Sequence, residues 1–229
     1  MLNDEWGSLN RTSLWLALFA GALVLCPACG GRQQQSTVAY EPPLAAQADL
    51  VRAGKSDRIV LSRDLVTDAD LAPLAGLGQL RELQLHHTRL GDSSAALLGA
   101  LKNLEVLALG QTSFGDSALA ALAPLSQLVR LQLASSQITD AGLDDLAAFP
   151  QLELLRLGSP LTSDAGVSAI CRLRHLRFVI LDDSRIGDPG LEQLAKLPEI
   201  ESLYVERTQV TEAGIARLLR ACPDVHVHW

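Results

Sequence analysis

Aromatic side chains are scarce in this chain, although apolar residues are abundant. Aromatic residues make up 4% of the 229 residues and there is a single Met, whereas 48% of the residues are hydrophobic. The core must therefore be built from Leu, Ala, Val and Ile. Small side chains of similar size favour many equal packing layers, so the composition points to internal repeats. Charged residues at 20%, beside so many apolar ones, exclude general disorder.

Basic residues and cysteines are also few. The 19 Lys and Arg side chains stand against 26 Asp and Glu, a net charge of −7, which argues against nucleic acid as a partner. Four cysteines are too few for a disulfide scaffold. The sequence lacks the GxxxxGK(S/T) phosphate loop, the GxSxG nucleophile turn and the HExxH zinc motif. We therefore expect a chain that is not an enzyme and that uses no cofactor and no metal.

Near the N-terminus the apolar run Leu14–Leu25 has only 12 residues. A membrane-spanning helix needs about 20 apolar residues, so the run is typical of the hydrophobic region of a signal peptide. It leads into Cys-Pro-Ala-Cys-Gly-Gly, which resembles the junction of a bacterial lipoprotein. The resemblance implies a lipid on Cys29, which Ala28 precedes, rather than on Cys26, which follows a large Leu.

Two alternatives to lipidation stay open, namely simple cleavage after Ala28 and an uncleaved anchor. In either processed form, residues 1–28 are the predicted signal peptide. Residues 29–43 contain Gly, Gln, Ser and Pro without an apolar period, which predicts a flexible tether.

From Ser56 onward the sequence repeats every 24 residues without an insertion. The units begin at Ser56, Leu80, Leu104, Leu128, Leu152, Leu176 and Ile200, and a partial unit begins at Asp224. Positions 4 and 6 of each unit are apolar and alternate with polar or mixed residues, which predicts a short strand with one buried face. Position 13 is acidic in every full unit, and apolar residues follow at positions 16 and 19, which predicts a short helix. We expect the acid to cap this helix or to place a charge in its first turn.

The repeat consensus, LxxLxLxxTxITDAGLxxLxxLPQ, resembles the leucine-rich repeat family and is best shown by residues 128–151. Its Thr-Asp-Ala-Gly-Leu helix starts look most like those of bacterial members. The resemblance implies an α/β fold: a right-handed solenoid over residues 56–229, with a parallel sheet on the concave side and short helices on the convex side. Seven repeats and a terminal strand follow a predicted capping helix over residues 44–55.

Three details of the repeat carry their own expectations. Pro160 stands where other units have a hydroxyl or a carboxylate, so we expect a local irregularity there. Trp229 is expected to cover the last layer. Cys171 and Cys222 lie two units apart, roughly 10 Å, so they are predicted to be free thiols.

The candidate binding site lies on the concave sheet face, at positions 3 and 5 of the strands. These positions are mostly polar in the first half of the solenoid, whereas the second half brings apolar side chains together inside a charged rim that includes Asp183 and Arg207. An apolar surface with a charged rim is typical of a protein-binding site, although single exposed apolar residues are ordinary. The predicted partner-binding residues are Leu154, Arg156, Phe178, Ile180, Asp182, Tyr204 and Glu206.

Two other groups on this face are weaker candidates. His226 and His228 share a face about 6.6 Å apart, but two ligands do not make a metal site. The polar half around Arg58, Glu82 and His86 is the alternative location for a partner.

The sequence thus predicts a non-catalytic protein-binding module of an exported bacterial protein. Its partner is a protein of unknown identity. The chain is predicted to be held at the membrane by a lipid anchor, in the periplasm or at the outer membrane, or else to be secreted. A structural envelope protein without a specific ligand and a substrate-recognition adaptor arm are the alternatives.

Overall fold

The computed structural model describes residues 41–62 and 64–229, all within a compact unit that spans residues 40–229. The predicted signal peptide, the lipidation site Cys29 and residues 30–40 of the predicted tether lie outside the described residues. No helix within the described part is both long and apolar enough to cross a membrane.

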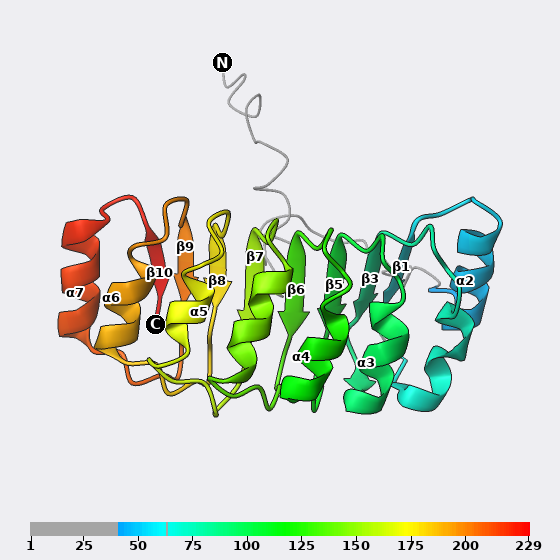
Figure 1. Cartoon of the computed structure of the whole chain (residues 1–229), viewed down its shortest axis with the longest axis horizontal. Coiled ribbons are helices and arrows are strands. Elements are labelled where there is room, and N and C mark those ends of the chain that lie inside the picture. The colour runs from blue at the N-terminus through cyan, green and yellow to red at the C-terminus, as the bar shows by residue number, and fades with distance from the viewer. Residues whose placement is uncertain (1–40, 63) are drawn as a thin grey trace, which may run out of the picture. The chain divides into compact units, whose positions relative to one another are not determined.

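The described chain is a stack of strand–turn–helix units whose strands form one parallel sheet (Figure 1). The eight strands are β1 (Arg58–Leu61), β3 (Glu82–Leu85), β5 (Val106–Leu109), β6 (Arg130–Leu133), β7 (Leu154–Leu157), β8 (Phe178–Ile180), β9 (Ser202–Tyr204) and β10 (His226–His228). They pair in sequence order with a constant offset of one repeat, so that Leu83 faces Leu107 and Leu107 faces Leu131. The predicted parallel sheet is confirmed.

Helices line one side of this sheet (Figure 1). They are α2 (Leu44–Arg52), α3 (Asp92–Gly99), α4 (Asp116–Leu122), α5 (Val167–Ile170), α6 (Asp188–Leu194) and α7 (Glu212–Ala221), with 3₁₀ helices η1 (Asp68–Leu74) and η2 (Gly142–Ala148). A short second sheet pairs β2 (Val66–Thr67) with β4 (Thr88–Arg89). A helix is about 10 Å across whereas strands pair about 4.8 Å apart, so the sheet forms the concave side of the solenoid.

The core lies between the sheet and the helices. Positions 4 and 6 of the seven full units are buried, as are the helix residues at positions 16 and 19, for example Leu143 and Leu146. This burial confirms the strand register expected from the period of two. Positions 3 and 5 point to the opposite face of the sheet, which we call the sheet face.

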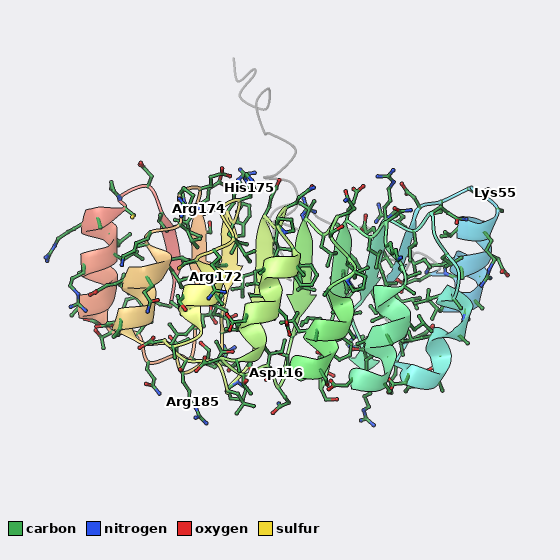
Figure 2. The ribbon with its side chains drawn as sticks, viewed as in Figure 1. Lys55, Asp116, Arg172, Arg174, His175 and Arg185 are labelled. Carbon is green, nitrogen blue, oxygen red and sulfur yellow. The ribbon has the colours of Figure 1, made fainter. Side chains whose placement is uncertain are left out.

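The acids at position 13 link one unit to the next. Each aspartate from Asp68 to Asp188 accepts a hydrogen bond, at 2.7–3.1 Å, from the position-12 backbone N–H of the following unit. In five units the N-cap is position 12, and the acid is the first helical residue. Of the two roles expected for the acid, the first-turn charge is thus the one found in these five units, whereas Asp140 and Asp164 precede their helices. Figure 2 shows one of these acids, Asp116, at the edge where the helices begin.

A second donor completes each carboxylate, and the close approach of the carboxylate leaves room only for glycine at position 15 of the last four units. The donor is a hydroxyl or, for Asp164, the backbone N–H of Gly190 at 3.0 Å. At position 15 of the last four units, a Cβ atom would lie only 2.1–2.6 Å from an oxygen of the preceding aspartate; the glycines there are Gly142, Gly166, Gly190 and Gly214. The Asp–x–Gly spacing is thus a packing requirement between neighbouring units.

The repeat departs from regularity at two places. At Pro160 the burial of positions 8 and 9 is reversed, because Ser159 is buried and Pro160 is exposed, so the predicted irregularity is confirmed. Two residues later Thr162 takes the buried position 11, which is apolar in the other units. Thr162 and Ser159 both donate hydrogen bonds to the carbonyl oxygen of Ile138, which replaces the lost apolar packing with polar contacts. Trp229 is 56% exposed, so the prediction that it covers the last layer is wrong.

Candidate functional site

Five of the seven residues predicted to bind a partner lie side by side on three neighbouring strands. In the register of the sheet, Leu154 faces Phe178, and Ile180 lies between Arg156 and Tyr204. All five side chains are half-buried. Asp182 and Glu206 follow on the loops that leave β8 and β9. We call the seven residues Leu154, Arg156, Phe178, Ile180, Asp182, Tyr204 and Glu206 the sheet-face patch.

Contacts with residues outside the patch hold both aromatic rings. The Tyr204 ring stacks on His228 of β10, with centroids 4.2 Å apart and planes 5° from parallel. The guanidinium of Arg177 lies 5.5 Å from the centre of the Phe178 ring. Neither contact was predicted, although Tyr204 and His228 share position 5 on adjacent strands, and this shared position is the sequence signal for the stack. A ring fixed before binding loses less conformational freedom when a partner arrives.

An ion-pair network forms the charged rim at the end of β8 and β9. Arg207 donates from Nε and Nη2 to the two carboxylate oxygens of Asp183, at 2.5 and 2.9 Å, and from Nη1 to Glu206 at 3.2 Å. The hydrogen bonds from Arg207 lower the pKa of the Asp183 carboxyl. Asp183 and Arg207 adopt left-handed backbone conformations, with φ of 59° and 55°, and both side chains are exposed.

Asp182 differs from its neighbour because it is partly buried beside the apolar side chains. Its Oδ1 accepts a hydrogen bond of 3.0 Å from the backbone N–H of Glu206. Burial raises the pKa of this carboxyl, against the opposing effects of that hydrogen bond and of Arg156. Burial and the charge of Asp182 also raise the pKa of Tyr204. The patch therefore combines an apolar centre with one desolvated carboxylate.

The polar half of the sheet face is more closed than the sequence suggests. Gln84, Ala108 and Gln132 occupy outward position 5, yet each is buried by its neighbours. Gln84 donates to Glu82 at 2.6 Å, and Arg58 lies 3.7 Å from the same carboxylate. These side chains satisfy one another, which makes this half a poorer docking surface than the patch.

The described residues give little support to a metal site or a reactive thiol. They contain no group of three His, Cys, Asp or Glu side chains that could hold a metal ion. Cys171 and Cys222 are free thiols, as predicted, and burial raises the pKa of Cys171. A cavity of about 400 Å³ lies at the N-terminal end, between α2, β1 and η1, with Leu44, Leu65 and Pro73 among its lining residues. The sequence analysis did not anticipate it.

Comparisons with known proteins agree with this architecture. Residues 126–147 and 172–195 match a family model described as Leucine Rich repeat. No curated protein matches the chain. The fold is similar to that of solved bacterial proteins, so the chain is an α/β leucine-rich repeat solenoid.

Three of these structures show the extent of the likeness. An internalin (inlF) of Listeria monocytogenes aligns with a TM-score of 0.53 and 19% identity, over 79% of this chain and 63% of that one. Internalin C2 (inlC2) of the same species aligns with a TM-score of 0.57 and 25% identity, over 74% of this chain and 70% of that one. A leucine-rich repeat protein of Leptospira interrogans aligns with a TM-score of 0.54 and 14% identity, over 80% of this chain and 51% of that one. The chain thus spans less than two thirds of the length of the first and third structures.

Proposed function

We propose that this chain is a non-catalytic binding protein and that another protein docks on the sheet-face patch. The observation that carries the proposal is the placement of Phe178 and Tyr204. Two of the few aromatic side chains of the sequence stand on adjacent strands at positions that the core does not need. The buried residues of positions 4 and 6 already fill the core.

The chemistry of the patch supports a protein partner. Binding hot spots are typically rigid aromatic side chains at the centre of a surface that a polar rim shields from water. The stacked Tyr204 supplies the rigid centre, and the pair of Asp183 and Arg207 supplies the rim. Leucine-rich repeat folds are typical of protein-interaction modules, and their stacked strands offer an extended surface. A structural envelope protein would have no need for this clustering, and an adaptor arm would use the same face.

Binding of the double variant Phe178→Ala/Tyr204→Ala tests the proposal. The full chain is immobilised and exposed to the envelope fraction of its own organism, and the affinity of each captured protein is then measured. Loss of both rings should weaken binding by about 2 kcal/mol, or roughly thirty-fold. The matched control is Val60→Ala/Val106→Ala, which removes half-buried apolar groups from the other half of the same face. Equal affinity of both variants for the partner would refute the patch as the site.

We also propose that the chain is exported and held in the cell envelope by a lipid on Cys29, on the strength of the sequence of its N-terminal segment. Cys29→Ser should abolish incorporation of labelled fatty acid and release the chain from membranes. Cys26→Ser is the matched control, because it removes the neighbouring thiol and should leave both properties intact. Label retained in Cys29→Ser but lost in Cys26→Ser would assign the lipid to the other cysteine.

A further inference from the structure

The charged groups of the sheet-face patch and its rim are compensated to different degrees. Arg207 donates hydrogen bonds to the carboxylates of both Asp183 and Glu206. Asp182, by contrast, is half-buried and forms no ion pair with any residue that the structure describes. Its Oδ1 accepts a hydrogen bond from the N–H of Glu206, whereas its Oδ2 accepts none from the described residues. This second oxygen can therefore accept a hydrogen bond from a partner.

Arg156 does not make up for the missing ion pair. It lies on β7, one strand away, and its guanidinium forms no ion pair in the described part of the chain. Burial raises the pKa of the Asp182 carboxyl despite the opposing hydrogen bond from Glu206 and the charge of Arg156. The carboxylate has thus lost more hydration than its neighbours replace, and a cation that reached it from a partner would supply the missing compensation.

The chain leaves room for such a cation next to Asp182. Asp182 stands at position 7 of its unit, and position 7 of the preceding unit is Gly158. A Cβ on Gly158 would lie 3.8 Å from the carbonyl oxygen of Asp182, so the two residues are immediate neighbours. Because glycine has no side chain, nothing at position 7 of the preceding unit shields Asp182 from a partner on the sheet face.

Apolar side chains border the carboxylate on the same face. Ile180 precedes Asp182 by two residues, and Tyr204 faces Ile180 in the register of the sheet. Burial, and after it the charge of Asp182, raises the pKa of the Tyr204 hydroxyl, which places this ring close to the carboxylate. His228 stacks on one face of the ring from β10, so the other face is turned toward β8. An apolar surface that ends at a carboxylate suits a side chain with an aliphatic stem and a cationic head.

We propose that the partner protein places an Arg or Lys side chain at this point, with its stem on Ile180 and Tyr204 and its head donating a hydrogen bond to Oδ2 of Asp182. The inference rests on the proposed function, because it specifies the chemistry of the partner at the same patch. An acidic side chain is disfavoured there, since it would meet the like charges of Asp182 and Glu206.

The charge of the whole solenoid also favours a basic partner. The sequence has a net charge of −7. The position-13 acids lie along the edge where the helices begin, as Asp116 shows in Figure 2. β8 ends at this edge too, because a short loop joins it to Asp188 at the start of α6. A negative edge beside the patch attracts a basic surface over a distance and orients it before contact.

A random-peptide phage library, selected on the immobilised full chain, tests the inference before the partner is known. Peptides that need the patch are recognised by their loss of binding to Phe178→Ala/Tyr204→Ala. We expect these peptides to be enriched in Arg or Lys beside apolar residues, and selection on Asp182→Asn to remove that enrichment. Ring-dependent peptides without basic residues would overturn the inference and leave the proposed function standing. A library that yields no ring-dependent peptide would refute both.

A double-mutant cycle between the full chain and the strongest ring-dependent peptide then locates the contact. Asp182→Asn and replacement of the basic residue of the peptide by Gln should each weaken binding about tenfold, and the combination should weaken it no further. The matched control is Asp183→Asn, which removes the neighbouring carboxylate that Arg207 already pairs and should leave the affinity within about twofold. Effects of the two changes that multiply would show that the basic residue binds elsewhere, and would contradict the inference.

Discussion

At the residue scale, the acids at position 13 show how one side chain can serve two units. Asp188 lies in the first turn of α6, yet both of its oxygens accept hydrogen bonds from Thr211 of the next unit, at 2.7 and 2.8 Å. These hydrogen bonds lower the pKa of the Asp188 carboxyl. A depressed folded-state pKa means that the ionised group stabilises the fold above the unfolded-chain value of about 4. That contribution is lost as the pH falls through the lower folded-state value.

Asp188→Asn should therefore lower the thermal midpoint at neutral pH and have progressively less effect as the pH falls below about 4. In acid the wild-type side chain is protonated too, so the two proteins lose the same charge-assisted bonds. Thermal unfolding followed by circular dichroism at several pH values measures the difference. Asp57→Asn is the control, because no hydrogen bond or ion pair of this exposed carboxylate is found in the described part of the chain. If the thermal midpoints of wild type and Asp188→Asn differed by the same amount at all pH values, the account would be contradicted.

The residues predicted to bind a partner differ in how much of their surroundings the sequence reveals. The sequence places Tyr204 and Phe178 on the right face because the period of two fixes the direction of every strand residue. It does not reveal the partial burial of Asp182, since that depends on the neighbouring strand and loop. Desolvation then makes Asp182 unlike Asp183, whose carboxylate Arg207 neutralises.

At the element scale, the strands could be predicted and the helix starts only in part. A period of 24 without insertions fixes the pairing of the whole sheet, because each strand repeats the register of the one before. The role of the acids could not be predicted in the same way. An acid before a helix suits a cap, a first-turn charge and a bond to the next unit equally well, and only the distance to the following backbone N–H distinguishes them.

The irregular positions of the repeat, too, could be predicted only in part. Pro160 predicts a local irregularity, and the structure shows it as a buried Ser159 beside an exposed Pro160. Trp229 was expected to be buried on the basis of its position in the repeat. Position 6 is buried only when a following unit covers it, and none does so within the described residues.

At the scale of the whole molecule, the sheet-face patch occupies β7, β8 and β9, in the C-terminal half of the sheet. In the first half of the same face, polar side chains satisfy one another, as Gln84 and Glu82 do. We therefore expect a partner protein to dock toward the C-terminal end of the sheet face rather than along its whole length.

The central claim is that a partner protein sits on the sheet-face patch, and photo-crosslinking within the living cell tests it most directly. A photoreactive phenylalanine analogue is placed at Phe178 or, as the matched control, at Val106, which occupies the same position 3 on β5 and is likewise half-buried. The account predicts a covalent adduct of discrete mass from position 178 and none from position 106. Adducts from position 106 alone, or none from either position while the protein is folded, would contradict it.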